Sequence, residues 1–138
     1  MALSKAEQAV KQYKNLGLQG EIEAASPHRL IQMLMDGLLA KIVAARYCIG
    51  SNNIAGKGEN ISMAISIVGG LRASLDMDKG GDIAGNLDNL YDYMERRLLE
   101  ANLRSDVMIL DEIMGLVNEI KSAWDAIGSE LVASQQVS

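Results

Sequence analysis

Few side chains in this sequence could carry covalent chemistry. One histidine, His28, and one cysteine, Cys48, occur in 138 residues. A lone histidine can accept a phosphoryl group in four-helix phosphotransfer domains, but there the imidazole stands midway along a helix, whereas His28 directly follows Pro27. We therefore expect an exposed histidine without a chemical role, and phosphotransfer through His28 stays open as an alternative. Cys48 lies among apolar residues, which predicts a buried, unreactive thiol in a reducing compartment.

Two short motifs approach known ligand sites and then depart from them. Gly56-Lys57-Gly58 is similar to part of a phosphate-binding loop, but Gly58 occupies the place of the metal-binding Ser or Thr. Asp76 and Asp78 match the first ligand positions of a calcium-binding loop, but Leu87 occupies the position where a bidentate Glu is required. The paired Glu-x-x-His motifs of di-metal helix bundles are missing as well. The sequence therefore predicts no catalytic residue, no cofactor and no metal, and the protein is expected not to be an enzyme.

Apolar residues recur at helical spacing in four stretches of the chain. Short polar or glycine-containing segments separate these stretches, which favours antiparallel neighbours. The sequence predicts an all-α fold, an antiparallel up-down four-helix bundle over residues 26–128. The expected helices cover residues 27–49, 61–75, 82–101 and 107–128.

Local signals predict where these helices begin and end. Ser26 is expected to cap the first helix, with Pro27 at its first position. Asp82 is expected to cap the third helix and to place Ile83 on its inner face, and Gly128 marks the end of the fourth.

The two ends of the chain have no regular pattern. Gly17 and Gly20 interrupt the apolar residues of segment 1–25, so we expect a mobile N-terminal arm that forms at most a short extra helix. Residues 129–138 are expected to be a polar C-terminal tail.

Composition and charge narrow the class of partner. Hydrophobic residues make up 49% of the chain and charged residues 22%, as in ordinary globular proteins. The net charge of −5 disfavours nucleic acid and anionic membranes, both of which attract basic surfaces. No stretch approaches the roughly 20 apolar residues of a membrane span, and no signal peptide is recognisable. We expect a cytoplasmic protein, without membrane insertion, whose partners are other proteins.

Four motifs follow one another in order along residues 24–127. They are Ser26-Pro27 with Leu30-Ile31 and residues 33–37, Asn53-Ile54 with residues 57–62, residues 71–76, and residues 90–94 with 96–102. In this combination the chain resembles the FliS family of flagellar export chaperones.

The resemblance implies a chaperone that binds the disordered C-terminal segment of flagellin in the cytoplasm. It also implies that the chaperone prevents premature polymerisation and delivers flagellin to the cytoplasmic domain of the flagellar type III export gate protein. Flagellar regulators are further partners in this family. We expect a monomer or weak homodimer, and a purely structural helical oligomer stays open as an alternative.

The breadth of the apolar faces suggests where a client could bind. The apolar arcs of the first two helices are wider than one core contact requires, and two residues of the third helix lie off its main stripe. The apolar surface that the core does not need could form grooves for an amphipathic client helix. Each residue of these faces could equally belong to an ordinary core. The groove candidates are Ile31, Met35, Leu38, Met63, Ile67, Leu71, Leu75, Tyr93 and Leu99.

The N-terminal arm carries one further pattern. In the FliS family an aliphatic residue followed three positions later by Tyr is associated with docking to the export gate and with covering the empty client groove. Val10 and Tyr13 have this spacing here.

Overall fold

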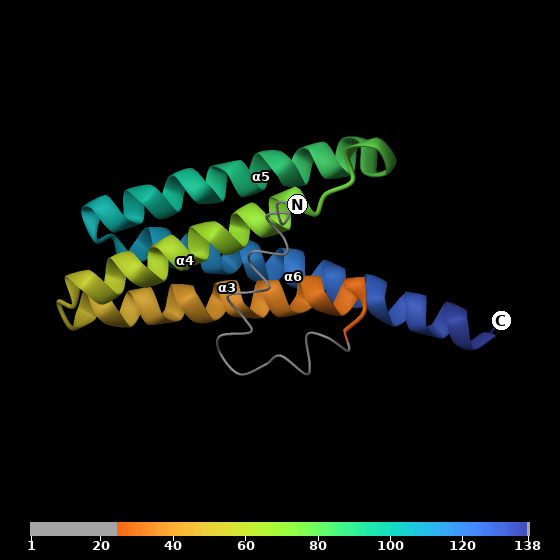
Figure 1. Ribbon diagram of the computed structural model, residues 1–138, viewed down its shortest axis with the longest axis horizontal. Coiled ribbons are helices and arrows are strands. Elements are labelled where there is room, and N and C mark those ends of the chain that lie inside the picture. Colours follow the sequence, from red (N-terminus) through yellow and green to blue (C-terminus); the bar gives the residue numbers. More distant parts are fainter. Residues whose placement is uncertain (1–24, 138) are drawn as a thin grey trace, which may run out of the picture.

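The computed structural model describes residues 25–137, and nearly all of them are helical. Figure 1 shows the chain running up and down through successive antiparallel helices, so the predicted all-α, up-down four-helix bundle is confirmed. The helices of this part of the chain are α3 (Pro27–Gly50), α4 (Ile54–Ala73), α5 (Met77–Arg104) and α6 (Val107–Val137). The predicted arm, with Val10 and Tyr13, lies outside the described residues.

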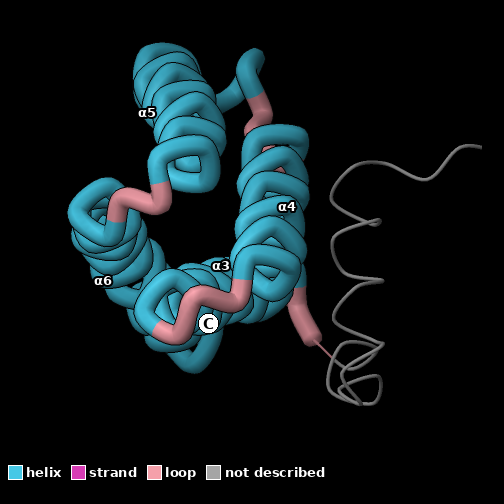
Figure 2. The backbone as a smooth tube through the Cα atoms, turned by 90° about the vertical axis from the view of Figure 1, so that its left-hand side faces the viewer, coloured by secondary structure: helices cyan, strands magenta, loops and turns pink. Residues whose placement is uncertain are grey.

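The four helices surround one apolar core. α3 packs against α4 and α6, and α5 packs against the same two helices, so each helix has two close neighbours (Figure 2). No polar or charged residue of the described part is buried. The largest fully buried side chains are Leu34, Met35, Leu38, Ile42, Ile61, Val68, Leu71, Met94, Leu98, Leu110, Ile113 and Val117.

The first two helices begin with side-chain caps. The Ser26 hydroxyl accepts a hydrogen bond of 3.1 Å from the Arg29 backbone N–H, and Pro27 follows at the first helical position, as predicted. The Asn53 side chain accepts from the Gly56 N–H at 2.9 Å and caps α4 in the same way. Cys48 is buried, as predicted.

The start of α5 differs from the prediction. Asp76, not Asp82, is the N-cap, and its side chain accepts a hydrogen bond of 3.0 Å from the Lys79 backbone N–H. After one turn the helix is interrupted at Gly81, whose φ of 53° and ψ of −130° lie in a region open almost only to glycine. The regular helix therefore resumes at the position where the sequence suggested a beginning.

The exposure of one side chain after this interruption also differs from the prediction. Ile83, expected on the inner face, is 74% exposed, whereas Tyr91, about two turns later, is only 4% exposed. Ile83 is not covered because it lines an open pocket at this end of the bundle instead of a closed core.

The end of α6 was also predicted incorrectly. The helix continues past Gly128 to Val137, so the backbone of the expected tail is helical. A glycine inside a helix costs only about 1 kcal/mol relative to Ala, and the residues that follow include good helix formers such as Glu130, Leu131 and Ala133. Ile127, in the last turn before Gly128, is 46% exposed.

Candidate functional site

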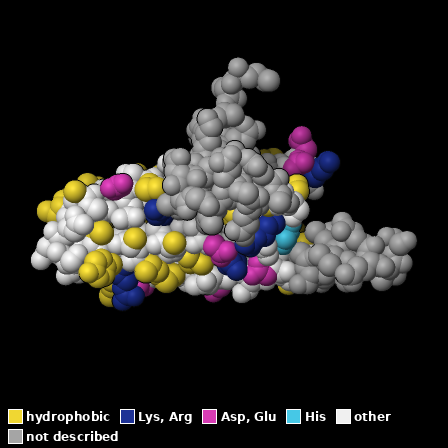
Figure 3. Space-filling view, turned by 60° about the horizontal axis from the view of Figure 1, so that its bottom comes forward, with side chains coloured by type: hydrophobic (Ala, Val, Ile, Leu, Met, Phe, Trp, Pro, Cys, Tyr) yellow, Lys and Arg dark blue, Asp and Glu magenta, His cyan; other side chains and the backbone are white. Residues whose placement is uncertain are grey.

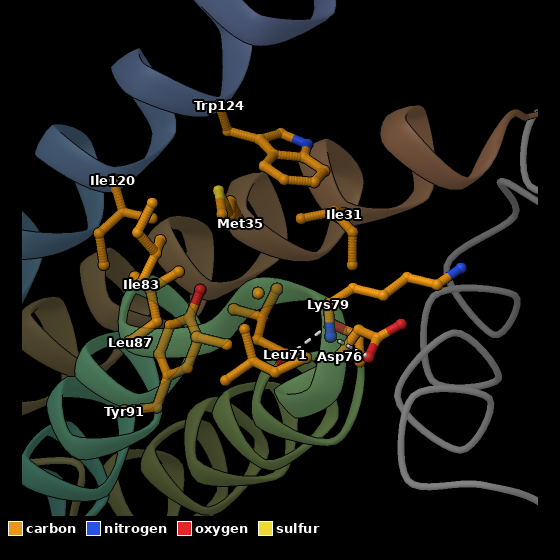
Figure 4. A pocket seen from close by; sticks show the side chains of 14 residues that line it. Ile31, Met35, Leu71, Asp76, Lys79, Ile83, Leu87, Tyr91, Ile120 and Trp124 are labelled. Carbon is orange, nitrogen blue, oxygen red and sulfur yellow. Dashed lines mark hydrogen bonds between the residues drawn. The ribbon is translucent and has the colours of Figure 1, made fainter.

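An apolar pocket opens at the end of the bundle where α4 ends and α5 begins. Its volume is about 400 Å³, and all four helices contribute to its wall (Figure 4). The residues that line it are Ile31, Met35, Leu71, Ser74, Leu75, Asp76, Lys79, Gly80, Ile83, Ala84, Leu87, Tyr91, Ile120 and Trp124. Pockets of this size with mostly apolar walls and a few polar groups are typical binding sites.

Four of the groove candidates come together in this pocket. Ile31 and Met35 stand one turn apart on α3, and Leu71 and Leu75 approach from the end of α4. Met35 and Leu71 are buried at its base, whereas Ile31 and Leu75 are half-buried. The structure therefore assembles the candidates of the first two helices that lie nearest to this end of the bundle.

The remaining groove candidates lie elsewhere. Leu38 and Ile67 are buried in the core, and Met63 is half-buried outside the pocket wall. Tyr93 is half-buried, and its hydroxyl donates a hydrogen bond of 2.8 Å to Glu112 of α6. Leu99 is 54% exposed, about two turns beyond the last pocket residue of α5.

The sequence did not reveal the other half of the pocket wall. α5 contributes Ile83, Leu87 and Tyr91, and α6 contributes Ile120 and Trp124. Ile83 was expected only on an inner face, and nothing in the sequence groups it with the other four residues, because periodicity within one helix cannot show which side chains of different helices meet. The paired glycines before residue 82 were the one local signal that α5 is interrupted at this end.

Two of the polar side chains of the pocket already hold hydrogen bonds. The Ser74 hydroxyl donates to the Leu71 carbonyl at 2.6 Å, and Asp76 accepts from the Lys79 backbone N–H. The Tyr91 hydroxyl has no hydrogen-bond partner within the described part of the chain, and burial raises the pKa of its phenol to about 12. The pocket thus holds a neutral phenol donor in an apolar wall.

A ring stack ties α6 to the beginning of α3 beside the pocket. The rings of His28 and Trp124 are nearly parallel, with centroids 4.6 Å apart, and the Trp124 indole N–H donates to the His28 carbonyl at 3.0 Å. Both ring nitrogens of His28 are buried and without a hydrogen-bond partner. The expectation of an exposed histidine was wrong, because the indole covers the imidazole.

Charged residues fasten α5 to α4 on the outside of the pocket. The Arg72 guanidinium forms ion pairs of 2.6 Å with Asp88 and 3.2 Å with Asp92. The hydrogen bond from Arg72 lowers the pKa of the Asp88 carboxyl. This clamp holds α5 beside α4 immediately after the pocket.

A second set of ion pairs joins α5 to α6. Arg97 pairs with Glu100 at 2.7 Å and with Glu112 of α6 at 3.1 Å. Arg96 pairs instead with Asp92, one turn earlier, at 3.1 Å. These arginines stabilise contacts within and between helices.

Exposed apolar side chains also occur at the opposite end of the bundle. Figure 3 shows hydrophobic side chains gathered over the end at which α3 finishes. The large exposed residues from this end are Val43, Tyr47, Ile54, Leu99, Leu103 and Met108. None of them lines the pocket.

Two general classes of site are not seen in the described residues. Within residues 25–127 no three His, Cys, Asp or Glu side chains lie close enough together to hold a metal ion. None of the helices in the part of the chain that the structure describes is long and apolar enough to cross a membrane.

Comparison with known proteins identifies the family. The sequence profile described as "Flagellar protein FliS" matches residues 9–131. The chain belongs to the FliS family. It is 48% identical to the flagellar secretion chaperone FliSB of Pseudomonas aeruginosa, over 86% of this chain and 94% of that protein. It is 46% identical to the flagellar secretion chaperone FliS of Salmonella typhimurium, over 86% of this chain and 88% of that protein.

Membership of the FliS family confirms two predictions made from the sequence. The resemblance to flagellar export chaperones is confirmed, and so is the prediction that the protein is not an enzyme. This FliS chain is a flagellar secretion chaperone whose bundle carries an apolar pocket at one end.

Proposed function

We propose that this FliS protein binds the C-terminal segment of flagellin in the cytoplasm and delivers it to the flagellar type III export gate. The observation that carries this proposal is the open apolar pocket, to which all four helices contribute. An apolar site on a helical bundle suits amphipathic client segments, which bind by laying their apolar faces into grooves. A bound segment would be shielded from polymerisation until export.

The size of the pocket indicates how a client is held. A volume of about 400 Å³ accommodates a few apolar side chains rather than a whole helix. The client would therefore be anchored in the pocket and continue over neighbouring surfaces, including that of Leu99. Because ordering a disordered segment costs part of the interaction energy, an anchored client that spreads over several helices can also be released in steps.

We further propose that Val10 and Tyr13 in the N-terminal segment contact the export gate and cover the groove while it is empty. Their spacing matches the family pattern, and the profile of the family begins at residue 9. Flagellar regulators are additional candidate partners. Deletion of residues 1–18 should leave flagellin binding intact or tighter and weaken binding to the cytoplasmic domain of the gate protein.

The proposal is tested with purified flagellin from the same organism and with flagellin lacking its C-terminal segment. We expect a stable complex with the complete flagellin only, measured by calorimetry and size-exclusion chromatography. Equal binding of both flagellins, or of neither, would overturn the proposal. The same chromatography across a concentration series tests the alternative of a structural oligomer, since a chaperone that associates weakly should lose that association when client is added.

Phosphotransfer through His28 is not supported by the geometry. A phosphoryl acceptor needs an accessible ring nitrogen, and both nitrogens of His28 are buried beside Trp124.

A further inference from the structure

Two polar groups of the pocket have no hydrogen bond within the described part of the chain. Ser74 and Asp76 are engaged within the chain, whereas neither the Tyr91 hydroxyl nor the Lys79 ammonium has a hydrogen-bond partner among the described residues. Lys79 is exposed at the mouth, where water can solvate its charge. Tyr91 as a whole is 4% exposed, but its hydroxyl is not among the buried atoms that lack a partner, so water in the open pocket reaches it.

The Tyr91 hydroxyl becomes important when the pocket is filled. In the free protein it faces the open pocket, where water can pair with it. A ligand that displaces this water without replacing its hydrogen bond leaves the hydroxyl unpaired and loses affinity. Figure 4 shows the Tyr91 hydroxyl directed into the pocket, on the side of Met35.

We propose that Tyr91 is a specificity residue, which donates a hydrogen bond to an acceptor oxygen of the client segment anchored in the pocket. This inference rests on the proposed function and adds the chemistry of the anchor. The C-terminal segment of flagellin would place an apolar side chain against Ile31, Leu75 and Trp124, and an uncharged carbonyl, amide or hydroxyl oxygen at Tyr91. An acceptor suits both unpaired groups of the pocket, because the Tyr91 hydroxyl can donate and the Lys79 ammonium can only donate.

Two sources of acceptor satisfy this chemistry. One is a backbone carbonyl at the C-terminal end of a client helix, where the last four carbonyls have no partner within the helix. The other is the side-chain oxygen of Asn, Gln, Ser or Thr in the client. In both cases the client oxygen replaces water at the phenol, so the hydrogen bond discriminates between client segments and does not hold the bundle together.

The experiment compares Tyr91→Phe with the matched control Tyr47→Phe, whose side chain is 76% exposed at the opposite end of the bundle. Binding of the C-terminal flagellin segment is measured by calorimetry, and the unfolding of each free protein by urea titration. We expect Tyr91→Phe to weaken binding about five- to tenfold, the effect of one hydrogen bond, while the free protein stays about as stable as the parent. Tyr47→Phe should bind like the parent.

A structural role for the Tyr91 hydroxyl would give the opposite pattern. Loss of stability in Tyr91→Phe with unchanged affinity would overturn the inference, and so would equal affinity with equal stability. In those cases the parent still binds, so the proposed function survives. If the parent itself does not bind the flagellin segment, the proposed function fails and the role of Tyr91 fails with it.

A double-mutant cycle distinguishes the two acceptors. Each Asn, Gln, Ser and Thr of the client segment is replaced by Ala and titrated against the parent and Tyr91→Phe. One replacement that removes the difference between the two proteins identifies a side-chain acceptor. A difference that persists through all replacements identifies a backbone carbonyl. In either case the ¹³Cζ resonance of Tyr91 should shift on binding, and an unchanged resonance at saturation would contradict direct contact.

Discussion

Three leucine residues that fit similar apolar positions in the helical pattern of the sequence have different environments in this protein. Leu38 has no exposed surface and belongs to the core, Leu75 is half-buried in the pocket wall, and Leu99 is 54% exposed. Each fits an apolar position on a helix, yet only the surroundings decide whether the side chain stabilises the bundle or remains available to a partner. Substitutions to alanine should therefore separate the two roles.

We predict that Leu38→Ala lowers the free energy of unfolding by about 2–5 kcal/mol, because it leaves a cavity in a closed core. Leu99→Ala should change it by no more than about 0.5 kcal/mol, since the side chain already lies largely in water. Urea unfolding followed by circular dichroism measures both. Similar losses from the two substitutions would show that Leu99 is packed in solution.

Tyr91 makes the stability of the protein depend on alkaline pH. Burial raises its folded-state pKa to about 12, above the ordinary value of about 10. Below pH 10 the phenol is neutral in both states and its contribution is fully present. As the pH rises from 10 to 12 the unfolded chain loses the proton first, so stability falls by up to about 3 kcal/mol.

The comparison with Tyr91→Phe isolates this effect, because the other groups that titrate at high pH are present in both proteins. Urea unfolding at intervals from pH 9 to 12 should show the parent losing more stability than the variant. Parallel curves for the two proteins would mean that the phenol ionises as easily in the folded as in the unfolded chain.

At the scale of single elements, the first turn of α5 is the most specialised segment. Gly81 has a backbone conformation that other residues adopt only with strain, and it separates the turn carrying Asp76 and Lys79 from the long regular helix. Gly85, one turn later, lies in regular helix and has open space where a Cβ atom would be added. Gly85 is therefore a suitable control position for a substitution at Gly81.

We predict that Gly81→Ala destabilises the protein by about 1–3 kcal/mol, because the left-handed conformation is strained for alanine. Gly85→Ala should instead stabilise it by about 0.5–1 kcal/mol, since alanine loses less backbone entropy in a helix. Thermal unfolding of both variants provides the measurement. A stabilising Gly81→Ala would show that α5 can straighten into one continuous helix at no cost.

The reliability of the sequence-based prediction varied with the range of the interactions involved. Ser26 and Pro27 were placed correctly because helix capping depends on neighbours within one turn. The exposure of Ile83 was not predicted, because the periodicity of one helix does not show that the closed core ends in an open pocket at this position. The pocket was anticipated only in its α3 and α4 wall, since the participation of Trp124 depends on how far four helices diverge at one end.

At the scale of the whole molecule, polar contacts join the antiparallel helices α3 and α6 along the length of their interface, which we call the seam. At the pocket end the final contact is the hydrogen bond from Trp124 to the His28 carbonyl. The contacts are Arg46 with Asp111 at 3.2 Å, Asp36 with Lys121 at 3.5 Å, Gln32 with Asp125 at 2.7 Å, and Trp124 with His28 at 3.0 Å. Trp124 therefore both closes the bundle and lines its pocket.

We predict that Trp124→Phe lowers the free energy of unfolding by about 1–3 kcal/mol, because it removes a hydrogen bond between distant helices and part of an aromatic stack. Ile127→Ala, at a half-exposed position less than one turn away, is the control and should cost less. Urea unfolding ranks the two variants. An equal or smaller loss for Trp124→Phe would show that the seam does not depend on this contact.

The position of Trp124 has a practical consequence as well. It is the single tryptophan of the chain, and its ring lies in the pocket wall. Indole emission responds to the polarity around the ring, so filling the pocket should shift the emission maximum to shorter wavelength and reduce quenching by acrylamide. The protein thus contains its own fluorescent reporter, with which any tryptophan-free client can be titrated without a label.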